Sequence, residues 1–86
     1  MARTEKQWAE ARELQTKLAT QGILAVYGGD SKGHGFWLYR ANPDAIARYE
    51  ATRGYTHLDD VTLIPNDGKR SGNPSFTMFQ DAVTVS

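Results

Sequence analysis

The sequence predicts an α+β domain, in which an antiparallel sheet of about four strands carries two helices on one face, in the order α-β-β-α-β-β. Three observations lead to this class. An amphipathic helical pattern opens the chain, two β-rich segments flank a glycine-rich stretch, and a second helical pattern precedes two short strand patterns. An apolar sheet face must be buried against another layer, so we expect a two-layer sandwich, of which a ferredoxin-like domain is one form.

The length of 86 residues predicts a single domain spanning residues 1–86. A chain this short buries only about 60% of its unfolded surface. The balance between burial and ordering entropy is then close to zero, so a partner or a homodimer would add to its stability.

The first helix is expected to begin after Thr4, because Thr4 and Gln7 have the spacing of a capping box. Gly22 is the natural residue just beyond its end. At 100° per residue, the apolar positions form one stripe that predicts a packed helix face. These positions are Trp8, Ala11, Leu14, Leu18 and Ala19.

A hairpin is expected next, with strands at 23–27 and 36–40 and a glycine-rich loop at 28–35. Both strands are apolar on both faces, and two short helices can cover only one face of a sheet. The other face is then expected to expose a patch around Phe36 and Leu38, which is typical of a binding surface. The alternative is that loops or the C-terminal tail cover this patch.

The second helix is expected to start at Asn42 and Pro43, a cap followed by proline at the first helical position, and to stop at Gly54. Its inward residues are expected to be Ala45, Ile46 and Tyr49.

The remaining residues predict two more strands. The first, at 61–64, is ended by Pro65, and a polar loop at 66–74 follows. Alternation of polar and apolar residues predicts the last strand at 75–79. The tail at 82–86 either extends this strand or stands alone.

Composition limits the compartment and the chemistry. The chain has no cysteine, which excludes disulfides, thiolate zinc sites and cysteine nucleophiles. Small secreted domains usually need disulfides, so we expect a cytoplasmic protein. Residues 1–6 lack the apolar run of a signal peptide. The longest apolar run, at 23–27, is far shorter than the roughly 20 residues that span a membrane, so no membrane contact is expected.

One segment of the hairpin is similar to a known motif. Residues 32–39 read Lys-Gly-His-Gly-Phe-Trp-Leu-Tyr, which resembles the longer ribonucleoprotein motif of RNA-recognition motif domains. The matching positions are Lys32, Gly33, Gly35, Phe36 and Tyr39. His34 replaces the usual aromatic residue, and Trp37 replaces an aliphatic one. The resemblance extends over residues 32–65 but lacks the family's first strand, which the segment at 75–79 would have to supply.

The resemblance implies a single-stranded nucleic-acid surface. Because side chains alternate along a strand, His34 and Phe36 would lie on the open face, while Trp37 and Tyr39 would point at the helices. Unpaired bases would stack on His34 and Phe36, each worth about 1–3 kcal/mol, and Lys32 would meet a phosphate.

Charge makes a weaker contribution to the predicted surface. Ten basic residues balance ten acidic ones, so the chain has no global positive excess of the kind that duplex binders show. Lys69 and Arg70 lie in the loop at 66–74 and would form a basic rim with Lys32 and Arg40; the alternative is a solvated loop tip. The predicted binding residues are therefore Lys32, His34, Phe36, Leu38, Arg40, Lys69 and Arg70.

Catalysis, metals and cofactors are not expected. The candidates for a metal site have no recognised ligand spacing; they are His34, His57, Asp59 and Asp60. Asp59 or Asp60 is better explained as a turn residue. None of the serines lies in a nucleophile-elbow pattern. The order of Ser31 and Lys32, with a strand after them, differs from that of a phosphate-binding loop.

The sequence thus leaves two kinds of partner for a non-catalytic binding module. One is single-stranded RNA or DNA on the open sheet face, which the motif favours. The other is a protein bound by the same face or by edge-strand pairing, which the neutral charge favours. A small domain without cofactor motifs also suits a regulator or inhibitor, such as a phage accessory protein that blocks a host enzyme or defence complex.

Overall fold

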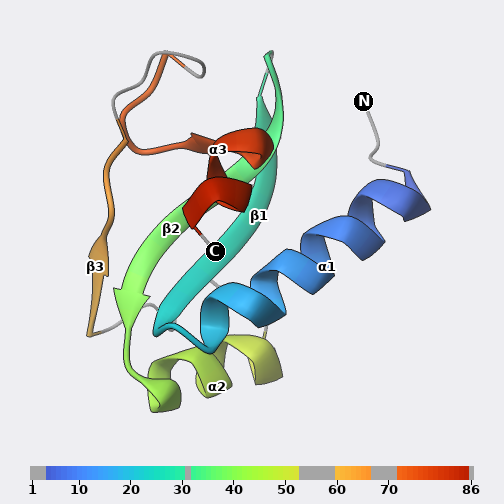
Figure 1. Ribbon diagram of the computed structural model, residues 1–86. Helices are drawn as coiled ribbons and strands as arrows, with labels where there is room; N and C mark the ends of the chain where they lie inside the picture. Colours follow the sequence, from blue (N-terminus) through green and yellow to red (C-terminus); the bar gives the residue numbers. More distant parts are fainter. Residues whose placement is uncertain (1–3, 31, 53–59, 67–71, 86) are drawn as a thin grey trace.

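The computed structural model describes residues 4–30, 32–52, 60–66 and 72–85. Figure 1 shows the elements that these residues form around one sheet. In chain order they are α1 (Glu5–Ala19), β1 (Ile23–Asp30), β2 (Gly33–Ala41), α2 (Pro43–Thr52), β3 (Val61–Leu63), β4 (Thr77–Met78) and α3 (Phe79–Val85). The predicted class, α+β with an antiparallel sheet of four strands, is confirmed, as is the order α-β-β-α at the start.

Strand β2 is the centre of the sheet. On one side it pairs antiparallel with the whole of β1, from Ile23 opposite Arg40 to Asp30 opposite Gly33. Its other side is divided between two short strands. The β3 strand pairs with the end of β2 that leads into α2, and β4 pairs with Gly35 and Phe36 near the hairpin.

Both long helices begin where the sequence predicts, because their caps are local. The backbone N–H of Gln7 donates to the Thr4 hydroxyl, and the Thr4 N–H donates to the Gln7 side chain, completing the capping box. At α2, the N–H of Ala45 donates to the side-chain oxygen of Asn42 over 2.8 Å. Gly22, with φ of 76°, follows α1 in a left-handed conformation.

The prediction of a glycine-rich loop at 28–35 is wrong, because most of this segment belongs to the two strands of the hairpin. Gly28 and Gly35 are strand residues that make room for neighbours. A Cβ at Gly28 would overlap the indole ring of Trp37, and a Cβ at Gly35 would overlap the backbone oxygen of Thr77. These glycines therefore serve close packing inside the sheet rather than a turn.

The first face of the sheet holds the larger core. Along β2, Phe36 is 0% exposed and Leu38 is 1% exposed, so the predicted exposed patch around them is wrong, and the alternative, that the C-terminal tail covers them, is confirmed. Helices α1 and α3 cover them (Figure 1), and Ala82 of α3 is itself fully buried. This cluster contains Ala11, Leu14, Leu18, Ile23, Ala25, Tyr27, Phe36, Leu38 and Ala82, with Ile64 and Phe79 packed against it.

The second face holds a separate cluster, and it is here that α2 contributes. Leu24 and Val26, which alternate with the first-face residues of β1, pack with Ile46 of α2. Trp37 and Tyr39 are partly buried against them, so the prediction that they point at both helices is also corrected. Helix α1 packs mainly on the first cluster, and only Ala19 at its end reaches the second, so the two predicted helices do not share one face.

The C-terminal segment differs from its prediction. The strand expected at 75–79 is limited to Thr77–Met78, and Phe79 already begins α3. The tail, for which extension of the strand and separation were both open, is helical up to Val85. This third helix is the element that closes the first face. Within the described part of the chain, no helix combines the length and the apolar character needed to cross a membrane.

Candidate functional site

A cleft of about 490 Å³ lies at the end of the sheet where β1 turns into β2. Three elements form it: α1, the tip of the hairpin, and the junction between β4 and α3. The residues that line this hairpin-end cleft are Glu10, Lys32, Gly33, His34, Met78, Phe79 and Gln80. They combine one carboxylate, one ammonium, one imidazole, an amide and two apolar side chains, a mixture typical of binding sites.

The half-buried imidazole of His34 is held in place by two neighbours. The hydroxyl of Tyr27 lies 2.5 Å from Nδ1 of His34, a hydrogen bond. The ring also stacks on Phe79, with centroids 4.8 Å apart and planes 7° from parallel. When the phenol donates to Nδ1, a neutral imidazole carries its proton on Nε2. No described residue hydrogen-bonds to that Nε2, so it remains available to a ligand.

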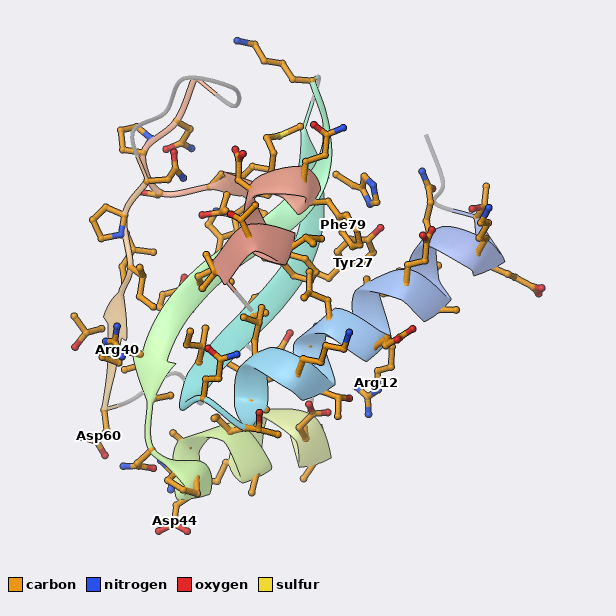
Figure 2. All side chains as sticks on the ribbon, in the orientation of Figure 1. Arg12, Tyr27, Arg40, Asp44, Asp60 and Phe79 are labelled. Carbon is orange, nitrogen blue, oxygen red and sulfur yellow. The ribbon has the colours of Figure 1, made fainter. Side chains whose placement is uncertain are left out.

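The two rings that hold His34 are anchored in the first-face core. Tyr27 packs edge-on against Trp8 of α1, with centroids 5.0 Å apart, and contacts Phe36 at 5.3 Å. Phe79 in turn lies 5.8 Å from Phe36. Figure 2 shows Tyr27 and Phe79 close together between α1 and α3. Because these rings pack on buried Phe36, the wall of the cleft is preorganised.

The two charged groups of the cleft differ in their surroundings. Lys32 is exposed at the hairpin tip, and its Nζ lies beside Gly72, where an added Cβ would be only 3.1 Å away. Glu10 is exposed on α1 and has neither a hydrogen bond nor an ion pair with any residue of the described ranges. The carboxylate of Glu10 is therefore the group whose charge a ligand would most readily compensate.

Of the residues predicted from the hairpin motif, the structure brings Lys32 and His34 to the cleft. Phe36 lies beneath the cleft in the core, and Leu38 is buried farther along β2. The prediction that Phe36 and Leu38 bind a partner is therefore wrong, since neither side chain offers a surface on which a base or a protein could rest.

The predicted basic rim does not form from the residues that the structure describes. Arg40 lies eight residues beyond Lys32 along the hairpin, roughly 26 Å away at the usual rise of a strand. Figure 2 shows Arg40 and Asp60 at the opposite end of the sheet from Tyr27 and Phe79. Lys69 and Arg70 lie outside the described residues.

The structure gives no support to the metal candidates where it describes them. Asp60, with φ of 62°, is a turn residue before β3, which pairs with the end of β2 opposite to His34. His57 and Asp59 lie outside the described ranges. Among the described residues, no group of three or more metal-binding side chains is assembled.

The place of Glu10 in the cleft, and the contacts of Tyr27 and Phe79 with His34, were not predicted from the sequence. Glu10 has the appearance of an ordinary solvent-facing helix residue, and Phe79 falls in the segment predicted as a strand. No local signal relates α1 to the start of α3, because only the packing of both helices on the sheet brings them together. Tyr27 shares a strand face with Ala25, which alone indicates burial and not its bond to His34.

Comparisons of the chain with protein-family models, with curated proteins and with solved structures found no match.

Proposed function

We propose that this chain is a non-catalytic binding module that holds a segment of another protein in the hairpin-end cleft. The observation that carries the proposal is the arrangement of His34. Tyr27 and Phe79 orient its ring, and its Nε2 is left without a partner among the described residues. A polar group that is held in place before the ligand arrives lowers the entropic cost of binding.

A protein partner is favoured over a single-stranded nucleic acid by three observations. Phe36 is buried and offers no stacking surface for a base. Lys32 and Arg40 lie toward opposite ends of the hairpin, so they do not form one phosphate-binding row. The net charge is zero, whereas the affinity of nucleic-acid binders depends on the release of counterions by clustered cations. A small regulator that acts by contacting a target protein fits these features.

Binding is also favoured over catalysis by the composition of the cleft. His34 and Glu10 are groups that can transfer protons, but the lining residues that the structure describes include no hydroxyl or thiol nucleophile.

The test is a selection of short random peptides displayed on phage against the intact chain, followed by NMR titration of the enriched peptides. We expect saturable shifts at the amides of Gly33, His34 and Phe79. The variant His34→Ala should weaken binding about tenfold, as loss of a central interface side chain does. The matched control, Arg40→Ala, removes an exposed side chain of the same strand far from the cleft and should leave affinity unchanged.

Two outcomes would contradict the proposal. One is that no peptide is enriched, or that the enriched peptides bind elsewhere on the chain. The other is saturable, salt-dependent binding of oligothymidylate or oligouridylate at the cleft, which would favour the nucleic-acid alternative. Unfolding temperatures of both variants, measured first, separate lost binding from lost structure.

A further inference from the structure

Glu10 differs from the other glutamates of the chain. Glu13 lies 4.0 Å from Lys17, and Glu50 forms an ion pair of 2.9 Å with Arg12. Glu5 lies in the first turn of α1, where the helix dipole favours a negative charge. Glu10 has no hydrogen bond or ion pair within the described ranges and lines the cleft. Of the four glutamates, Glu10 is therefore the one that lines the cleft.

The wall near this carboxylate is flat and aromatic. His34 and Phe79 stack with planes 7° apart, and Tyr27 closes one edge of the His34 ring at 5.6 Å. The side chain of Met78 adds an apolar surface over Gly33, where an added Cβ would lie 2.9 Å from the methionine methyl group. A carboxylate together with stacked rings is the chemistry that recognises a cation, because a planar cation can stack on a ring while it pairs with the carboxylate.

Resting on the proposed binding function, we infer that the hairpin-end cleft recognises a cationic side chain of the partner protein, with arginine the best fit. The guanidinium pairs with Glu10 and stacks on the exposed side of the His34–Phe79 pair. Arginine is favoured over lysine because its group is planar, forks onto carboxylates and is weakly hydrated. A phosphate or carboxylate would have to pair with Lys32 beside the negative charge of Glu10, and this is the alternative that an acidic peptide tests.

Model peptides test the inference directly. Blocked peptides of glycine with one central arginine, citrulline, lysine or glutamate are titrated into the isotope-labelled chain, and amide shifts are followed. Citrulline keeps the shape of arginine without its charge. We expect the arginine peptide to shift Gly33, His34 and Phe79 saturably and to bind about tenfold more tightly than the citrulline peptide, since both the ion pair and the ring contact depend on charge.

Substitution of Glu10 provides the second arm. Glu10→Gln should weaken the arginine peptide about fivefold, the upper range for an exposed ion pair. The matched control is Glu13→Gln on the same helix, whose carboxylate already faces Lys17, and it should have no effect. Both positions are exposed, so neither change should disturb folding.

Equal binding of the arginine and citrulline peptides, or no response to Glu10→Gln, would overturn the inference. Display-selected peptides that bind at the cleft without arginine or lysine would also overturn it, while the proposed binding function would stand. The proposed function fails separately, when no selected peptide binds at the cleft.

Discussion

The residues on the two faces of the sheet are buried from solvent to different extents, although the same strands form both faces. Along β2, Phe36 and Leu38 are almost fully excluded from solvent beneath α1 and α3. Trp37 and Tyr39, their alternate neighbours, remain partly exposed on the face to which α2 contributes. Tryptophan and tyrosine carry large apolar rings that contribute strongly to core packing where another element covers them. The extent to which a residue is buried therefore depends on how many elements cover its face of the sheet, and not only on how apolar the residue is.

The hairpin-end cleft lies where the more buried face, which contains Phe36 and Leu38, ends. His34 continues the row of Phe36 and Leu38 along β2, but it lies one step beyond the core. Helix α1 crosses β1 obliquely, and α3 begins at Phe79 (Figure 1). At this end the covering helices leave a cleft instead of a closed layer, so one strand row contributes both core and candidate site.

The largest expected effect comes from truncating one residue of each face. Phe36→Ala should lower the free energy of unfolding by about 3–5 kcal/mol, because it leaves a cavity in the closed core. Trp37→Ala should cost less, about 2 kcal/mol, since part of its ring is already in water. Urea denaturation followed by circular dichroism measures both. The motif resemblance implied the opposite order, with the larger loss of stability at Trp37. A larger loss at Trp37 than at Phe36 would support that assignment of the two faces. Phe36→Leu and Trp37→Leu give the same comparison should Phe36→Ala be unfolded.

The next effect concerns the strand glycines. Replacing a glycine by alanine without strain stabilises a protein by about 0.4–1 kcal/mol. Gly35→Ala should instead destabilise by about 3 kcal/mol, because the new methyl group meets the backbone of Thr77 and separates β4 from β2. Gly28→Ala should cost about 1–2 kcal/mol, since the partly exposed ring of Trp37 can move away from the new methyl group.

The same denaturation measurements decide the outcome, and hydrogen exchange at Phe36 and Met78 reports on the pairing of β4 with β2. In a Trp37→Leu background, Gly28→Ala should cost little, because the ring that the new methyl group meets is gone. Equal costs at Gly28 and Gly35 would show that Trp37 is as immobile as the backbone.

The smallest effect joins the helices that serve the two faces. Arg12 of α1 and Glu50 of α2 form an ion pair of 2.9 Å, with side chains 50% and 34% exposed. A double-mutant cycle with alanine at both positions should give a coupling below about 1 kcal/mol, and high salt should reduce it. A larger coupling would mean that this pair, rather than apolar packing, sets the position of α2.

Local signals were enough to predict where α1 and α2 begin. The caps at Thr4 and Asn42 depend on bonds that span three residues, so the sequence near each cap contains all the information required. Glycine gave the opposite result at 28–35. Its usual association with turns predicted a loop, whereas Gly28 and Gly35 are needed because Trp37 and Thr77 approach them in the folded sheet.

Only part of the candidate site was predicted from the sequence. Lys32 and His34 lie on a hairpin whose register follows from its own strands, and both reach the cleft as members of one segment. Glu10 and Phe79 come from distant helices, and their meeting depends on how α1 and α3 pack on the sheet. The residue pattern within either helix does not predict that Glu10 and Phe79 lie at the same cleft.

By itself, the sequence determined the α+β class, the capped starts of α1 and α2, and the pairing of two β-rich segments, because capping and strand alternation act over a few residues. Alternation separates Phe36 from Trp37, but it does not say which of two apolar faces is covered more deeply. Only the tertiary structure decided that, by adding α3 to the side of Phe36. The same long-range packing placed Glu10, His34 and Phe79 around one cleft, since burial and contact between distant elements depend on the path of the whole chain.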